Sequence, residues 1–85
     1  MEAMKFTERD AIERIVRNDN GFTLVSYETP GLGERVYVVT VKGLRGTVQK
    51  SIKKADVASV LRQMNDGIMP SRIRFVDPAR TPRRR

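Results

Sequence analysis

Apolar residues recur along the chain with two periods, one helical and one extended. Near the start, residues three and four positions apart are apolar: Ala11, Ile12, Ile15 and Val16. They follow Thr7 and Asp10, which have the spacing of a helix-capping box with Asp in place of the usual Glu. The helical period returns later, at Val57, Val60, Leu61, Met64 and Ile68. Because each segment runs into Asn, Asp and Gly, which tolerate the backbone at a helix end, we predict two amphipathic helices.

Between these helices the chain is rich in β-branched and aromatic residues and predicts three strands, at 22–28, 35–42 and 47–52. In the first strand the apolar positions change phase between Leu24 and Val25, which indicates either a β-bulge or partial cover on both faces. The second strand has apolar side chains on both faces, so we expect it at the centre of the sheet. A fourth strand, at an edge, is predicted over 71–76, where Ile73 and Phe75 alternate with arginines.

The predicted order is therefore α-β-β-β-α-β, which indicates an α+β fold. Two short amphipathic helices need a common surface on which to bury their apolar stripes. We expect both on one face of an antiparallel sheet of three or four strands, with the other face open to solvent or to a partner. Residues 1–76 are expected to form this single domain. Residues 77–85 contain two Pro and four Arg and are expected to form a basic, flexible tail.

The composition argues against several functional classes. The 85-residue chain contains no His, Cys or Trp, so it has no disulfide framework and lacks the usual ligands of zinc sites. Its apolar runs are much shorter than the ~20 residues of a membrane span. Gly43 and Gly46 do not have the spacing of a phosphate-binding loop, and no nucleophile has a visible base partner. We expect a protein of the cytoplasm, or one associated with the nucleoid, that is not an enzyme and has no cofactor or metal site.

Charge is divided unevenly along the chain. There are 17 Lys and Arg side chains against 10 Asp and Glu, a net charge of +7. Residues 1–41 hold five basic and seven acidic side chains, whereas residues 42–85 hold twelve basic and three acidic ones. A positive field confined to one half of a chain suits a polyanionic partner.

The candidate nucleic-acid-binding residues all come from this basic half. They are Lys42, Arg45, Lys50, Lys53, Lys54, Arg72, Arg74, Arg80, Arg83, Arg84 and Arg85. Three of them, Lys50, Lys53 and Lys54, come at or just before the start of the second helix, where the helix dipole disfavours cations unless an anion such as phosphate binds there. The alternative is that these lysines are ordinary solvated residues, and that Arg72 and Arg74 protect an edge strand from aggregation. Two rings, Tyr27 and Tyr37, are candidates for stacking on bases, with a place in the core as the alternative.

The stretch from Tyr27 to Met64 resembles the double-stranded-RNA-binding domain. That family also has the order α-β-β-β-α and carries lysines at the start of its last helix, the place held here by residues 51–55, Ser-Ile-Lys-Lys-Ala. The resemblance implies duplex binding through phosphates and shape. The chain departs from the family pattern in having no loop histidine and no Ala-rich last helix. The layout of three strands followed by a helix is also similar to the small DNA-binding domains at the start of tyrosine recombinases.

Together these features predict a small basic protein that binds DNA or RNA duplexes through backbone phosphates. Neutralising roughly five to seven phosphates implies a log–log salt slope of about −4.5 to −6 on B-DNA. The alternative is a protein-binding inhibitor or adaptor, of the phage or plasmid type, that docks on an acidic groove of a larger complex. A homodimer paired through the edge at 71–76 is a further possibility.

Overall fold

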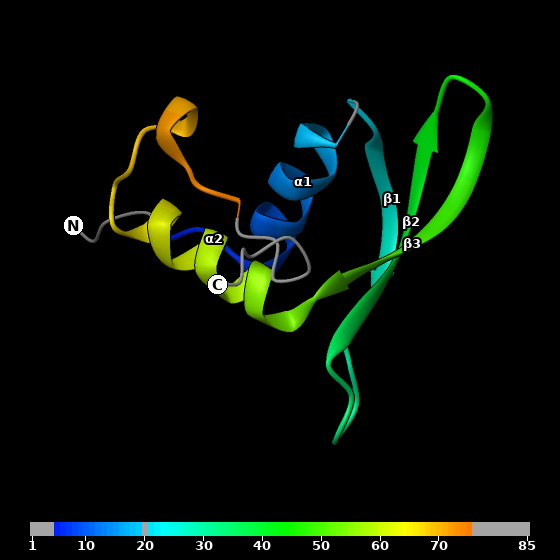
Figure 1. The fold of residues 1–85 in the computed structure, drawn as a ribbon, viewed down its shortest axis with the longest axis horizontal. Helices are drawn as coiled ribbons and strands as arrows, with labels where there is room; N and C mark the ends of the chain where they lie inside the picture. The colour runs from blue at the N-terminus through cyan, green and yellow to red at the C-terminus, as the bar shows by residue number, and fades with distance from the viewer. Residues whose placement is uncertain (1–4, 20, 76–85) are drawn as a thin grey trace, which may run out of the picture.

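Both helices lie on one side of a three-stranded antiparallel sheet, with the first helix against the sheet and the second packed mainly on the first (Figure 1). The computed structural model describes residues 5–19 and 21–75. Its elements are α1 (Glu8–Asn18), β1 (Thr23–Glu28), β2 (Val36–Gly43), β3 (Gly46–Lys53), α2 (Lys54–Asn65) and a short 3₁₀ helix, η1 (Pro70–Arg72). The α+β class and the order α-β-β-β-α confirm the sequence prediction.

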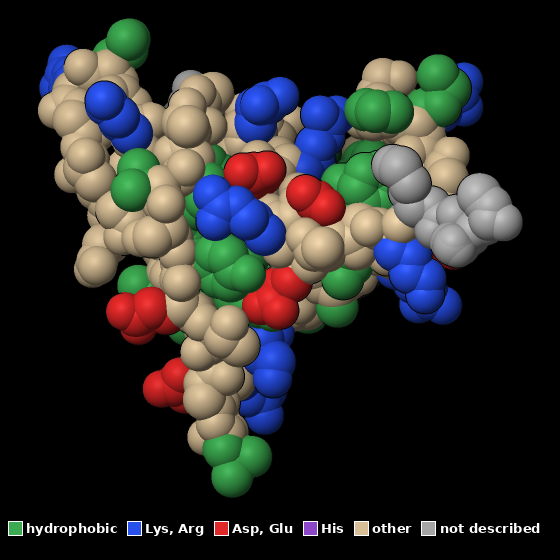
Figure 2. Space-filling view, turned by 180° about the vertical axis from the view of Figure 1, so that it is seen from behind, with side chains coloured by type: hydrophobic (Ala, Val, Ile, Leu, Met, Phe, Trp, Pro, Cys, Tyr) green, Lys and Arg blue, Asp and Glu red, His purple; other side chains and the backbone are tan. Residues whose placement is uncertain are grey.

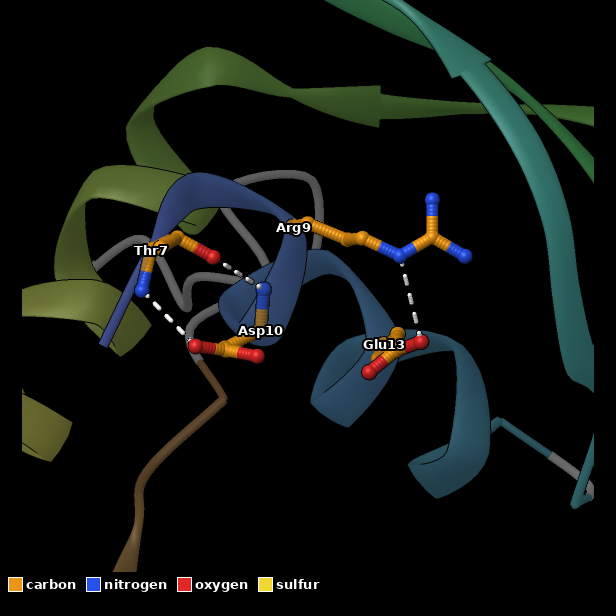
Figure 3. A network of polar contacts seen from close by, with 4 residues as sticks. All are labelled: Thr7, Arg9, Asp10 and Glu13. Atoms are coloured by element: carbon orange, nitrogen blue, oxygen red, sulfur yellow. Dashed lines mark hydrogen bonds and ion pairs between the residues drawn. The ribbon is translucent and has the colours of Figure 1, made fainter.

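Helix α1 begins at the predicted capping box (Figure 3). The Thr7 hydroxyl accepts a hydrogen bond from the Asp10 backbone N–H at 3.2 Å, and the Thr7 N–H donates to the Asp10 carboxylate at 2.8 Å. These bonds satisfy backbone donors that a helix start otherwise leaves unpaired. Arg9 and Glu13, four residues apart, form an exposed ion pair at 3.4 Å. The capping box therefore fixes where α1 starts.

The central strand is β2, which pairs with β1 on one side and β3 on the other. Alternate residues Tyr37, Val39 and Val41 are buried and face the helices. The pairing of β1 with β2 shifts register between Leu24 and Ser26, so a bulge lies where the apolar pattern changes phase. The central place of β2 confirms the sequence prediction, and the register shift at the first strand is the bulge, one of the two alternatives that the sequence left open.

The hydrophobic core lies between the two helices and this face of the sheet. Its buried residues are Ala11, Ile12, Val16, Leu24, Tyr37, Val39, Val41, Ile52, Val57, Val60 and Ile73. Helix α2 follows β3 directly, and the Lys54 N–H donates to the Arg35 carbonyl oxygen at 2.9 Å. This bond ties the start of α2 to the segment that precedes β2.

The fourth strand predicted over 71–76 is wrong. Its first residues belong to η1, and residues 73–75 belong to no strand. Ile73 is buried in the core while Arg74 is exposed, and the Arg74 backbone bonds to the Gln63 side chain of α2. The alternation of apolar residues and arginines thus comes from an extended segment that packs on a helix. The homodimer considered above would need an edge strand here, and the described residues 71–75 form none.

The second helix ends at the Asn-Asp-Gly sequence predicted to stop it, before the last position of its apolar pattern, Ile68. It ends at Asn65, and Gly67 follows with a φ of +85°, a backbone conformation that glycine adopts without strain. Ile68 therefore lies beyond the helix and is 39% exposed. Within residues 5–19 and 21–75, neither helix has the length and hydropathy needed to cross a membrane.

Candidate nucleic-acid interface

The sheet has a second face, turned away from both helices (Figure 1). Directly opposed residues of paired strands point to the same side of a sheet, so the register assigns each side chain to a face. Lys42 pairs with Thr47, and Val36 pairs with Lys53. On β2, Val36 and Lys42 are each an odd number of residues from the buried Val39, so they point away from the helices. Lys42 and Lys53, the partner of Val36, therefore project from the uncovered face.

Short uncharged side chains occupy this face between the two lysines. The register places there Val38, Thr40, Thr47, Gln49 and Ser51 of β2 and β3, with Ser26 on β1. Glu28, at the end of β1, is the one acidic residue that the three strands contribute to it. Lys42 is separated from Val36, the partner of Lys53, by six residues of β2, or about 20 Å.

Further exposed cations stand at each end of the uncovered face. Arg45 is in the β2–β3 turn, beyond Lys42. At the opposite end, Arg35, Lys53 and Lys54 line an open groove of about 560 Å³. Arg35 is absent from the sequence prediction because it lies in the half of the chain with net negative charge. Only the antiparallel register, which sets Val36 opposite Lys53, brings it beside the lysines.

Lys50 does not belong to this interface. It pairs with the buried Val39, so its side chain lies on the helix side of the sheet. There its Nζ forms an ion pair with Asp19, at the end of α1, and lies 4.7 Å from the centre of the Phe22 ring. The register thus places the side chain of Lys50 on the helix side of β3 and that of Lys53 on the uncovered face, so the lysines near the start of α2 do not share one face of the sheet.

The remaining predicted arginines do not extend the lysine surface. Arg72 is in η1, and Arg74 is in the segment that packs on α2, so both lie on the helix side of the molecule. The edge strand on which both arginines were expected is absent from the described residues 71–75. The other predicted positions, Arg80, Arg83, Arg84 and Arg85, lie outside the described residues, as does the rest of the tail predicted at 77–85.

The two tyrosines lie on the helix side as well, where they contribute to the core. Their ring centres are 6.2 Å apart, and Tyr37 is only 8% exposed. Burial, with a hydrogen bond and the charge of Glu8, raises the pKa of Tyr37 to about 12. Neither ring is placed to stack on bases at the uncovered face, which leaves the core as their role.

Charges of both signs lie close together on the side of the molecule that Figure 2 shows. Figure 2 shows Lys and Arg side chains in separate groups, with Asp and Glu side chains between several of them. The described cations therefore do not form one continuous patch on that side. Among the described residues, the uncovered sheet face has Lys42 and Arg45 at one end and Arg35, Lys53 and Lys54 at the other, with Glu28 on β1 and Glu34 beside the groove.

No protein-family model, curated protein or solved structure matches the chain. In the described part of the chain, no group of three Asp or Glu side chains is placed to hold a metal ion. Function must therefore be argued from the charges and geometry of the sheet face.

Proposed function

We propose that this protein binds duplex nucleic acid through its backbone phosphates, with the uncovered face of the sheet as the contact surface. The observation that carries the proposal is the placement of Lys42 and Lys53 on that one face. Lysine ammonium groups neutralise phosphates, and the hydroxyl and amide side chains between them donate hydrogen bonds to phosphate and sugar oxygens.

The spacing of the lysines supports a duplex as the partner. Their separation of about 20 Å exceeds the ~12 Å width of the major groove of B-DNA. The two ends of the face can therefore contact phosphates on both sides of a groove, with the middle of the sheet above it. Side chains in the middle are short, so affinity comes from the backbone rather than from reading bases.

The experiment is a titration of the full chain with a fluorescent DNA duplex and an RNA duplex, by anisotropy, over a series of salt concentrations. Lys42, Arg45, Arg35, Lys53 and Lys54 account for a slope of about −4.5, and the tail arginines bring the expected slope for the whole chain to as much as about −6. Affinity that hardly changes with salt would contradict the proposal. Absence of binding at low salt would favour the protein-binding alternative, an inhibitor or adaptor on an acidic groove.

Two double variants distinguish a specific contribution of the uncovered face from an effect of net charge. Lys42→Gln with Lys53→Gln removes two cations from the uncovered face and should reduce the slope by about 1.8. Arg17→Gln with Arg62→Gln removes two exposed cations from the helices, and this control should leave the slope unchanged. Equal effects of both pairs would mean that net charge, and not this face, determines binding.

A further inference from the structure

The turn between β2 and β3 exposes a leucine completely. Leu44 is 106% exposed and stands with Arg45 between Gly43 and Gly46, the last residues of the two strands to pair. Single exposed leucines are common on protein surfaces. What distinguishes Leu44 is how the turn beneath it is built and which charges surround it.

The turn is held in a defined conformation at its base. Gly46 has a φ of +117°, which residues with a side chain rarely adopt. A Cβ at Gly43 would overlap the Phe22 ring, so that ring packs directly on the hairpin backbone. Phe22 is in turn contacted by Lys50, which is paired with Asp19. Lys50, predicted as a phosphate ligand, thus serves to hold the hairpin, which extends past the helices (Figure 1).

The charged residues next to Leu44 in the sequence are all positive. Lys42 and Arg45 flank it, and the chain has no acidic residue from Lys42 to Ala55. Leu32, in the β1–β2 loop, is equally exposed, at 105%. However, its loop contains Glu34, whose carboxylate accepts a hydrogen bond from the Gly31 N–H at 2.7 Å. Two leucines are thus fully exposed, and of the two only Leu44 lies in a turn without an acidic residue.

We infer that the tip of the β2–β3 hairpin enters the minor groove of duplex DNA, where Leu44 wedges into a base step beside Arg45. The inference rests on the proposed function and names its substrate class as DNA with a deformable step. An apolar wedge next to a cation is the combination by which proteins unstack and kink DNA from the minor groove. Pyrimidine–purine steps such as TA are the most easily unstacked. Lys42, on the uncovered face beside the tip, then lies at the phosphates between the two grooves.

The test uses a DNA duplex with one TA step in a G·C-rich sequence and 2-aminopurine, a base whose fluorescence rises on unstacking, in place of the adenine. The full chain should raise this fluorescence on binding. Leu44→Ser should abolish the rise and weaken binding by about tenfold, a factor that the burial of one leucine side chain can supply. Leu32→Ser is the matched control and should behave as the unchanged protein. Thermal melting should be the same for all three, since both leucines are fully exposed.

The possible results separate this inference from the proposed function. Duplex binding without a fluorescence rise, or an unchanged Leu44→Ser variant, would overturn the wedge while leaving phosphate binding in place. Absence of duplex binding at low salt would overturn both. A third arm uses vesicles of phosphatidylserine and phosphatidylcholine. Leu44-dependent binding to these vesicles, with no fluorescence rise on the duplex, would assign the tip to a lipid surface and overturn the inference.

Discussion

At the scale of single residues, the Tyr37 hydroxyl joins the central strand to the start of α1. It bonds to the Glu8 carboxylate, and burial of the ring is the largest cause of the raised pKa of about 12. Ionisation would place a phenolate beside a carboxylate, away from water. The bond therefore stabilises the fold only while Tyr37 is protonated.

Replacement of Tyr37 by Phe should show this as a dependence of stability on pH. A tyrosine in the unfolded chain titrates near pH 10, below the folded value of about 12. The stabilisation is therefore complete below pH 10 and is lost as the pH rises towards 12. Tyr37→Phe should lower the free energy of unfolding by about 1 kcal/mol at neutral pH, and the difference should shrink above pH 10. Urea unfolding measures it, with Tyr27→Phe as the control, and a difference independent of pH would contradict the assignment.

At the scale of elements, the sequence predicts what local chemistry determines. The capping box at Thr7 and the change of phase at Leu24 are both features of neighbouring residues, and both are found in the structure. The prediction of a strand after η1 fails because the partner of this segment is distant in sequence. The Gln63 amide donates to the Arg74 carbonyl oxygen and accepts from the Arg74 N–H, each at 2.9 Å, so it takes the place of a neighbouring strand. Period-two alternation cannot distinguish that partner from a strand.

Replacement of Gln63 by Ala should release this segment. Both bonds to Arg74 disappear, and loss of two hydrogen bonds should cost about 1–2 kcal/mol of unfolding free energy. The Arg74 amide hydrogen should also exchange faster with solvent, which hydrogen-exchange NMR measures directly. Gln49→Ala, an exposed glutamine on β3, is the control. If Arg74 exchanged at the same rate in Gln63→Ala and in the unchanged protein, Gln63 would not be what holds the segment.

At the scale of the molecule, composition predicts the sign of the partner but not the shape of the site. The excess of cations in the second half identifies a basic protein, yet a strand separates residues that are close in sequence. Lys50 and Lys53 are three residues apart, an odd offset that points them to opposite sides of β3. Arg35 shows the reverse case, since it reaches the lysines only through the pairing of β2 with β3. The sheet register, rather than position along the chain, determines which charges act together.

Two single substitutions on β3 test this division of roles, since each removes one positive charge. Lys50→Gln breaks the contacts with Asp19 and Phe22. It should lower the unfolding free energy by up to about 1 kcal/mol, as expected for an exposed ion pair and a cation–ring contact, with the salt slope of duplex binding unchanged. Lys53→Gln removes a cation from the start of α2, where the helix dipole disfavours it. The unfolding free energy should then stay the same or rise slightly, while the salt slope of duplex binding becomes less negative by about 0.9. Urea unfolding and anisotropy titrations on the same samples decide between the two roles. The opposite pattern, a changed slope for Lys50→Gln and lowered stability for Lys53→Gln, would assign nucleic-acid binding to Lys50 and a structural role to Lys53.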